Sequence, residues 1–130
     1  MNNIQDYIIN KPFKVSQAQS AAILDGSKNE RVIAGAGAGK TEILIRKVIY
    51  LLLIKNLKPE NIVAFTFTDK AANEMKERII RRIREIDSEY NINQLSHIYI
   101  GTIHSFCFRV LQESYGYGLY KLLDPNEEMA

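Results

Sequence analysis

One short segment of the chain alternates alanine with glycine and ends in a lysine and a threonine: Ala34-Gly35-Ala36-Gly37-Ala38-Gly39-Lys40-Thr41. Arg31–Ala34 leads into it with the pattern of a short buried strand, and Thr41–Lys55 continues from it as a helix that ends at Asn56 and Pro59. Glycines let backbone amides curl around anionic oxygens, and the N-terminus of a helix adds partial positive charge. The segment therefore predicts a phosphate-binding loop between a strand and a helix, which restricts the chain to an α/β fold.

The lysine and threonine that close this loop have the chemistry that a bound nucleotide needs. Lys40 is expected to reach the β and γ phosphates, and the hydroxyl of Thr41 to ligate Mg²⁺. The strict phosphate-loop pattern begins with glycine, where this chain has Ala34. The alternative is a glycine-rich turn without a ligand. The strand and helix on either side favour the nucleotide site, with the backbone of Gly35, Ala36, Gly37, Ala38 and Gly39 around the phosphates.

Helix-like and strand-like patterns alternate along the rest of the chain. We expect further helices over 16–25, 69–87 and 102–115 and strands over 61–68 and 97–101, with residues 1–15 as a lead-in and 88–96 as a polar loop. This alternation predicts a parallel sheet with flanking helices, joined by right-handed crossovers. The whole chain, 1–130, then consists of the lead-in, a core over 16–115 and the start of a further connection over 116–130.

Apolar spacing predicts which faces of these elements are buried. The near-continuous apolar run of the strand over 61–68 indicates cover on both faces. Ser16 is expected to cap the first helix, and Gly26 to end it in a left-handed conformation. The helix over 69–87, with Asp69 as its cap, has apolar residues at every third or fourth position: Ala72, Met75, Ile79, Ile83 and Ile86. The last helix is expected to face inward with Ile103, Phe106, Cys107, Val110 and Leu111.

Composition excludes several other classes of protein. A single cysteine, Cys107, rules out an internal disulfide framework and a cysteine-rich zinc site, and it favours a reducing cytoplasm as the location. The longest wholly apolar run, Val48–Ile54, is far short of the roughly 20 residues that a membrane span needs. The N-terminus lacks the basic start and apolar run of a signal peptide. The net charge of +2 neither requires nor excludes nucleic acid.

Hydrolysis of a nucleotide needs a further carboxylate that holds Mg²⁺ and helps to activate water. The candidate in this sequence is Asp69, at the end of the strand over 61–68. Two threonines interrupt the approach to it, and no second acid follows. We therefore interpret Asp69 as a helix cap.

Four segments carry a resemblance to a known family: Val15–Gln19, Ala34–Thr41, Thr66–Ala72 with Glu74-Met75, and Gly101–Cys107. In this order they resemble the Q motif, phosphate loop, motif Ia and motif Ib of the UvrD/Rep-like superfamily 1 DNA helicases, in the N-terminal part of their first motor domain. The family's phosphate loop commonly begins with alanine, as here. The resemblance implies a RecA-like P-loop NTPase fold, ATP and Mg²⁺ as cofactors, and an ATP-dependent helicase that translocates along single-stranded DNA.

The resemblance also implies roles for single residues. Gln19 would pair with the adenine edge, because an amide both donates and accepts hydrogen bonds. Phe67 would stack on or wedge between bases, with packing in the protein as the alternative. The other implied DNA contacts are Thr66, Thr68, Thr102 and His104.

Three positions depart from the family pattern. Asp69 stands where asparagine is usual, Ile103 replaces a phenylalanine, and Glu42 stands where several members carry an arginine stacked on adenine. The chain also ends before the Asp-Glu pair of motif II and before the second motor domain, so the resemblance implies an N-terminal fragment of a helicase. Such a fragment is expected to bind nucleotide weakly and to hydrolyse it hardly at all. An exposed apolar sheet edge should make it either self-associate or be only marginally stable.

Two other interpretations of the whole chain remain open. One is a truncated homologue that binds nucleotide or DNA without catalysis. The other is a small P-loop phosphotransferase, in which the arginines over 78–84 would form a lid. We interpret the basic residues of that helix as a solvated face, with the steering of DNA phosphates as the alternative: Lys76, Arg78, Arg81, Arg82 and Arg84. His97 is interpreted as structural.

Overall fold

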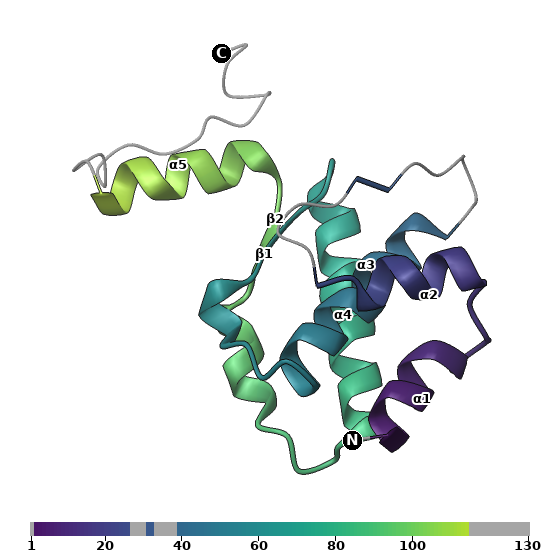
Figure 1. Ribbon diagram of the computed structural model, residues 1–130. Coiled ribbons are helices and arrows are strands. Elements are labelled where there is room, and N and C mark those ends of the chain that lie inside the picture. The colour runs from purple at the N-terminus through teal and green to yellow at the C-terminus, as the bar shows by residue number, and fades with distance from the viewer. Residues whose placement is uncertain (1, 27–30, 33–38, 115–130) are drawn as a thin grey trace.

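The computed structural model describes residues 2–26, 31–32 and 39–114. Their elements run in the order α1 (Asn2–Asn10), α2 (Gln17–Leu24), α3 (Lys40–Leu53), the 3-10 helix η1 (Pro59–Asn61), β1 (Val63–Phe65), α4 (Asp69–Ile86), the 3-10 helix η2 (Ile92–His97), β2 (Tyr99–Gly101) and α5 (Ile103–Ser114). Figure 1 shows α1 and α2 beside α3 and α4, with the two strands between that group and α5. The predictions for 33–38 and 116–130 lie outside the described residues.

The two described strands pair in parallel, as predicted, with Phe65 of β1 opposite Gly101 of β2. The amide of Thr66 extends the ladder by donating to the Gly101 carbonyl oxygen at 2.8 Å. The strands are shorter than the sequence indicates, and Arg31 and Val32 are not in a strand. The prediction that the first of these strands is covered on both faces is wrong, because Val63 is 47% and Phe65 43% exposed. Phe106 of α5 contacts the Phe65 ring but leaves it partly exposed.

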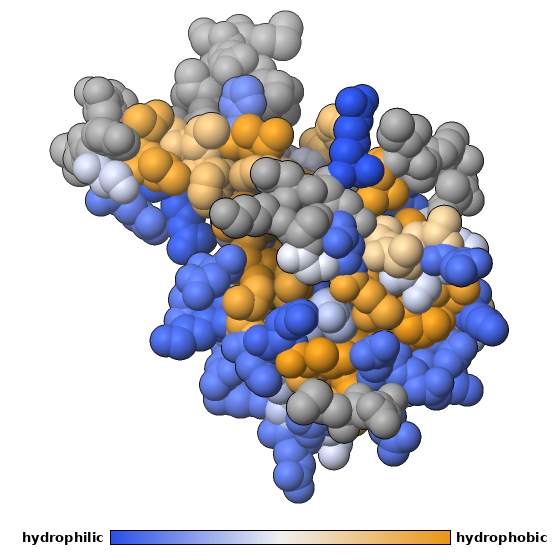
Figure 2. All heavy atoms as spheres, in the orientation of Figure 1, coloured by the Kyte–Doolittle hydropathy of each residue, from blue (hydrophilic) through white to orange (hydrophobic). Residues whose placement is uncertain are grey.

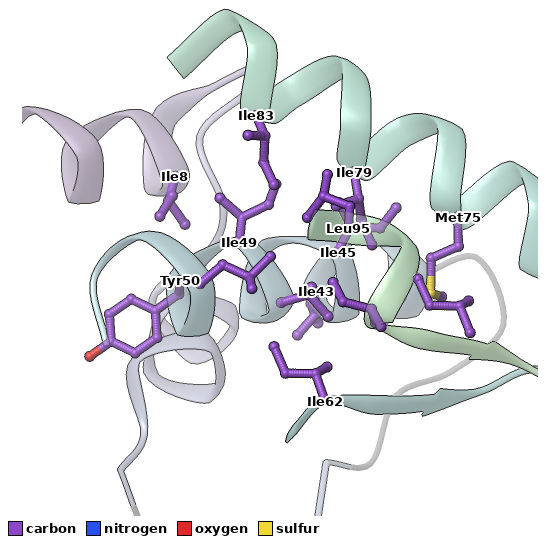
Figure 3. Packing of buried hydrophobic residues seen from close by; sticks show 14 of the residues in the cluster. Ile8, Ile43, Ile45, Ile49, Tyr50, Ile62, Met75, Ile79, Ile83 and Leu95 are labelled. Carbon is purple, nitrogen blue, oxygen red and sulfur yellow. The ribbon is translucent and has the colours of Figure 1, made fainter. Parts of the chain in front are cut away.

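The buried core lies between α3 and α4, and Figure 3 shows isoleucines of both helices pointing toward one another. Ile45 and Ile49 of α3 are 0% and 1% exposed. The predicted apolar stripe of α4 is confirmed: Ala72, Met75, Ile79 and Ile83 are buried, and Ile86 is partly buried against them. Burial of each large side chain contributes roughly 1.5–3 kcal/mol, so this stripe fixes which face of α4 lies against α3.

The predicted lead-in over 1–15 contains a helix, α1. Ile8 is 2% exposed within the core, and the hydroxyl of Tyr7 donates to the carboxylate of Glu85 on α4. Burial raises the pKa of Tyr7 to about 12, and the hydrogen bond to Glu85 adds to the effect. The N-terminal residues are thereby joined to α3 and α4.

The ends of the helices differ from the predictions in detail. Ser16 caps α2 as expected, but α2 ends at Leu24 with Asp25 extended, and Gly26 has no left-handed backbone. Asn56 takes the left-handed conformation beyond α3, with φ 54°. The cap of α4 is Thr68, whose side chain accepts from the Ala71 amide, and Asp69 is the first helical residue. The hydroxyl of threonine reaches that amide, so the interpretation of Asp69 as the cap is wrong.

The polar loop expected over 88–96 contains η2, in which Leu95 is buried. His97 is the last residue of η2, so it does not begin the strand predicted over 97–101; that strand, β2, begins at Tyr99. A buried leucine in this short turn gives the connection an anchor in the core.

Helix α5 forms as predicted, but its expected inward face is not buried. No residue of α5 is buried, Ile103 is 59% and Leu111 42% exposed, and Cys107 is exposed. Figure 2 shows apolar side chains gathered on the surface over α5. Among the described residues, the helix is held mainly by Phe106, whose ring meets those of Phe65 and Tyr99 at centroid distances of 5.3 and 5.0 Å. None of the helices in the described residues has the length and apolar content needed to span a membrane.

Candidate functional site

The first turn of α3 lies at the end of the predicted phosphate loop. Gly39 precedes the helix with φ 80°, a conformation that favours glycine, and no side chain caps the helix there. Lys40 and Thr41 are both exposed. Because the first amides of an α-helix have no partner within the helix, an uncapped first turn presents N–H donors and partial positive charge to an anion. Gly35–Ala38 lie outside the described residues.

Gln19 of α2 lies directly beside this turn. A Cβ atom added to Gly39 would be 3.5 Å from Nε2 of Gln19. The Gln19 side chain also completes a capping box, since its Oε1 accepts from the Ser16 amide at 2.9 Å while the Ser16 hydroxyl accepts from the Gln19 amide at 3.2 Å. The structure thus brings together two of the predicted nucleotide segments and orients the Gln19 amide by its own helix cap.

A lysine on α3 fixes the position of α2. Nζ of Lys47 donates to the carbonyl oxygen of Asp25 at 2.5 Å and contacts that of Ala22 at 3.5 Å. These carbonyls belong to the end of α2, where backbone acceptors lack helical partners and cations are favourable. Lys47 therefore anchors the helix that carries Gln19 to the helix that carries Lys40 and Thr41.

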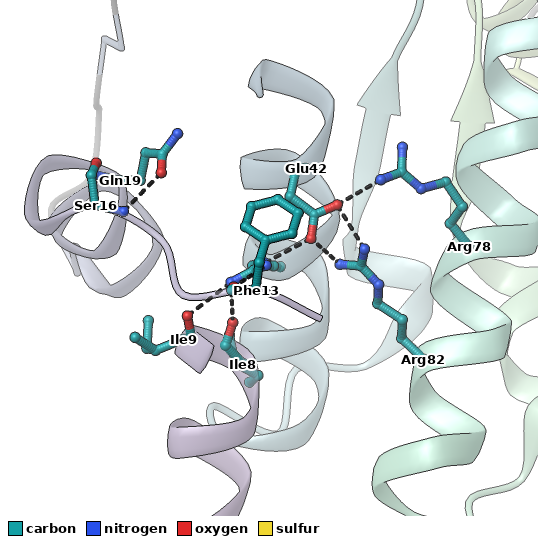
Figure 4. Close-up of polar contacts among 9 residues, drawn as sticks. Ile8, Ile9, Phe13, Ser16, Gln19, Glu42, Arg78 and Arg82 are labelled. Carbon is teal, nitrogen blue, oxygen red and sulfur yellow. Dashed lines mark hydrogen bonds and ion pairs between the residues drawn. The ribbon is translucent and has the colours of Figure 1, made fainter. Parts of the chain in front are cut away.

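Glu42, the residue after Thr41, is a buried ionic centre that sequence reasoning missed. Its side chain is surrounded by three arginines, and Figure 4 shows two of them reaching it from α4. Arg46 donates through Nε at 2.7 Å, and Arg78 through Nη2 at 2.6 Å. Arg82 donates to both carboxylate oxygens, through Nη2 at 2.7 Å and through Nη1. The interpretation of the whole basic face of α4 as solvated is wrong for Arg78 and Arg82, because they pair with a carboxylate on α3.

The pKa of Glu42 reflects two opposing effects. Burial raises the pKa of a carboxyl group, because it disfavours the charged form. The hydrogen bonds and charges of Arg82 and Arg46 outweigh burial, so the pKa of Glu42 lies below its usual value of 4.5. The carboxylate is therefore charged at neutral pH and committed to the arginines.

Arg46 extends the same network to α1. It is 1% exposed, and its Nη1 donates to the carbonyl oxygens of Ile8 and Ile9, each at 2.9 Å. Its Nη2 donates to the carbonyl oxygen of Phe13 at 2.8 Å, and the Phe13 ring lies 4.9 Å from the guanidinium carbon. A single guanidinium thus satisfies acceptors at the end of α1 and a carboxylate on α3. The i, i+4 spacing of Glu42 and Arg46 in a mostly apolar helix was the available signal.

The predicted DNA-contacting residues fall at one edge of the sheet. Thr66, Phe67 and Thr68 follow β1, and Thr102 and His104 follow β2. Since the two strands are parallel and Phe65 pairs with Gly101, both segments leave the sheet from neighbouring strand ends. The carboxyl ends of parallel strands are where ligands bind in open α/β sheets.

Phe67 is the most exposed aromatic residue at this edge, at 102%, so its ring packs against no other described side chain. The neighbouring threonines are held in place, because the Thr66 hydroxyl donates to the Thr68 carbonyl oxygen at 2.9 Å and Thr68 caps α4. Across the edge, Thr102 Oγ1 accepts from the Ser105 amide at 3.2 Å at the start of α5, and His104 is exposed. The packing alternative for Phe67 is wrong for the described residues.

The described residues contain no cluster of three or more histidine, cysteine, aspartate or glutamate side chains suited to hold a metal ion alone. Asp69, in the first turn of α4, is exposed and belongs to no such cluster. The arrangement combines an uncapped helix N-terminus beside an oriented amide with a separate edge that presents an exposed aromatic ring. It is a helix-flanked parallel α/β arrangement with the sequence of a nucleotide phosphate loop.

Comparison with known proteins defines the family. Residues 15–121 match the UvrD/REP helicase N-terminal domain, and the chain belongs to this family. It is 44% identical over 96 residues to the ATP-dependent DNA helicase SRS2 of Saccharomyces cerevisiae, covering 74% of this chain and 8% of that protein. It is 35% identical over 114 residues to the ATP-dependent DNA helicase PcrA of Staphylococcus aureus, covering 85% of this chain and 14% of that protein.

A third relative is the probable DNA helicase II homolog of Mycoplasma capricolum, 41% identical over 98 residues, which are 75% of this chain and 12% of that protein. The chain thus matches between 8% and 14% of the length of these three curated relatives. The resemblance to the UvrD/Rep-like helicases is confirmed at the level of the family.

Proposed function

We propose that the chain is the nucleotide-binding N-terminal region of an ATP-dependent DNA helicase that translocates along single-stranded DNA. The observation that carries the proposal is the uncapped first turn of α3, with Lys40 and Thr41 exposed and Gln19 beside Gly39. Membership of the UvrD/REP helicase family supports it.

The residues present fit ATP with Mg²⁺. Bound ATP supplies the phosphoryl group whose transfer to water drives movement, and Mg²⁺ neutralises charge on its phosphates. On this chain, the α3 amides and the Lys40 ammonium would hold the phosphates and the Thr41 hydroxyl would ligate the metal. The Gln19 amide, oriented by Ser16, would contact the adenine edge.

The same proposal assigns single-stranded DNA to the edge formed by Thr66–Thr68 and Thr102–His104. An exposed aromatic ring stacks on any base and contributes roughly 1–3 kcal/mol per base, which suits Phe67. The threonine hydroxyls and His104 would contact the strand's backbone. This sequence-independent mode matches an enzyme that moves along a strand.

We expect hydrolysis by this chain alone to be slow. The described carboxylate that follows Thr41, Glu42, is bonded to three arginines and does not act as a base for water. In the family's full-length proteins, the second motor domain and the inserted subdomains would supply the missing groups. The rival proposal, a module that binds nucleotide or DNA without catalysis in any context, has the same binding residues and differs only in turnover.

Calorimetric titration of the chain with MgATP and with MgGTP tests the nucleotide site. Saturable binding that favours ATP and is abolished by Lys40→Ala is the expected result. Lys55→Ala is the matched control, because it removes a lysine beyond the other end of α3 and should leave binding unchanged. Binding that survives Lys40→Ala would overturn the proposed site.

A further inference from the structure

Glu42 connects the two halves of the proposed site. It lies in the first turn of α3, directly after Thr41, while the arginines that hold it from across the core belong to α4. Helix α4 begins where the predicted DNA segment Thr66–Thr68 ends. One carboxylate thus joins the phosphate end of α3 to the helix that follows the DNA segment.

The hydrogen bonds from Arg82 and Arg78 to Glu42 depend on the position of α4 relative to α3. The side chain of Arg82 is 12% exposed, and it donates to both carboxylate oxygens of Glu42. The side chain of Arg78 is 35% exposed, and it donates to Oε2 alone. A bidentate guanidinium–carboxylate pair tolerates little change in angle or distance. A displacement of α4 along or away from α3 would therefore weaken these bonds.

Helix α4 is able to transmit such a displacement over its length. It is one uninterrupted helix of 18 residues, and its buried residues extend from Ala72 to Ile83. At 1.5 Å of rise per residue, Arg78 lies roughly 15 Å along the axis from Thr68. A strand that shifts the start of α4 on binding therefore shifts the arginines as well.

The charge of Glu42 makes its arginines relevant to phosphate binding. A carboxylate in the first turn of the phosphate-binding helix repels phosphate oxygens. Three guanidinium groups on one carboxylate reverse the sign of the local charge while α4 is in place. If α4 moves away, Arg78 and Arg82 leave, and the repulsion increases.

We infer that Glu42 is a positioning residue that holds the phosphate end of α3 against α4, so that nucleotide binding and single-stranded DNA binding are energetically linked through the Glu42–Arg78–Arg82 contacts. This inference rests on the proposed function. Linkage is reciprocal, so each ligand changes the affinity of the other by the same factor. A cluster with a purely structural role would change the stability of the chain and leave that factor unaltered.

A thermodynamic cycle tests the inference on the full 130-residue chain. The dissociation constant of MgADP is measured with and without a saturating thymidine oligonucleotide, and that of the oligonucleotide with and without MgADP. For the unmodified chain we expect both ratios to be equal and to differ from 1 by roughly fivefold or more.

Three variants locate the linkage. Glu42→Gln removes the carboxylate charge and should bring the ratio to 1 while MgADP still binds, since the repulsion no longer exists. Arg78→Gln removes a half-exposed partner with less risk to folding and should reduce the ratio. Arg84→Gln is the matched control, because Arg84 is an exposed arginine of the same helix outside the Glu42 contacts. It should leave the ratio unchanged.

The outcomes separate this inference from the proposed function. If both ligands bind but the ratio is 1 in the unmodified chain, the inference is wrong and the proposed function stands. The inference also fails if Glu42→Gln and Arg78→Gln keep the full ratio, or if Arg84→Gln lowers it equally. Absence of MgADP or oligonucleotide binding by the unmodified, folded chain would overturn the proposed function together with the inference.

Discussion

Helices α4 and α5 have the same kind of apolar spacing, yet only α4 buries its apolar face. Ile79 and Ile83 of α4 are 2% and 0% exposed, while Ile103 and Leu111 of α5 are 59% and 42% exposed. Helix α4 packs on α3, whereas the described residues give α5 only the aromatic cluster at the end of the sheet. Periodicity therefore identifies which face of a helix is apolar, but the burial of that face depends on a partner.

The ionic contacts of these two regions differ in the same way. Arg46 is buried and bonded to Glu42 and to three backbone carbonyls, while Arg109 of α5 pairs with Glu113 at 3.0 Å with both side chains more than half exposed. Arg46→Ala is expected to reduce the free energy of unfolding by about 3–5 kcal/mol, because it leaves three backbone acceptors without this donor and removes one of the arginines that hold the buried carboxylate. Arg109→Ala should cost about 0–1 kcal/mol. Urea denaturation of both variants measures the difference, and equal losses would contradict it.

The apolar faces give the second test. Ile83→Ala should cost about 2–5 kcal/mol, because it removes a fully buried side chain from the contact of α4 with α3. Leu111→Ala should cost less than about 1 kcal/mol, since 42% of this residue is already exposed to water. The midpoints of thermal unfolding rank the two variants. A loss for Leu111→Ala as large as that for Ile83→Ala would show that α5 is buried in solution, for example by self-association.

Acid affects the buried ionic network in a defined direction. The pKa of Glu42 is lowered in the folded chain, so its contribution to stability is fully present above its usual pKa of 4.5 and is lost as the pH falls through the lower folded value. The stability difference between the unmodified chain and Glu42→Gln should therefore be constant near neutral pH and shrink below about pH 4.5. Chemical denaturation at a series of pH values measures it. A difference that stays constant into strong acid would show that Glu42 is not charged in the folded state.

The smallest effect on stability is expected at Cys107. Its side chain is exposed on α5, so Cys107→Ser should change the free energy of unfolding by no more than about 0.5 kcal/mol. In the native chain, the thiol should react with a disulfide reagent at the rate of a free cysteine. Reaction that proceeds only on unfolding would mean that a partner covers this face of α5.

The sequence predicts those features of this chain that depend on local chemistry. The Ser16 cap, the extents of α3 and α4, the stripe of α4 and the parallel pairing of the two described strands follow from spacing and turn residues. The family resemblance assigns Gln19 and the phosphate loop to one nucleotide, but it does not predict that Gln19 lies beside Gly39. The cap, the helix extents and the apolar stripe can be predicted without knowing which elements are in contact.

Other features depend on contacts between distant residues, which spacing does not reveal. Arg78 and Arg82 lie 36 and 40 positions from Glu42, so spacing alone does not predict that they pair with it. Helix α1 has apolar residues at Ile4 and Ile8, one helical turn apart, but the polar residues between them hid the pattern. The apolar face of α5 predicts Cys107 in the core, but the strands contact this face through Phe106 and leave Cys107 exposed.

The guanidinium of Arg46 also decides how specifically α1 is placed. Isoleucine contacts are interchangeable, so a purely apolar interface would tolerate α1 sliding by one turn, with Ile4 entering where Ile8 now lies. The planar Arg46 guanidinium donates to Glu42 and to three carbonyl oxygens, those of Ile8, Ile9 and Phe13. These hydrogen bonds can form in only one alignment of α1 on α3. Any slipped arrangement would bury a cation without its acceptors. Arg46 thus makes the alignment of α1 on α3 specific, because a slipped α1 would leave its guanidinium without these acceptors.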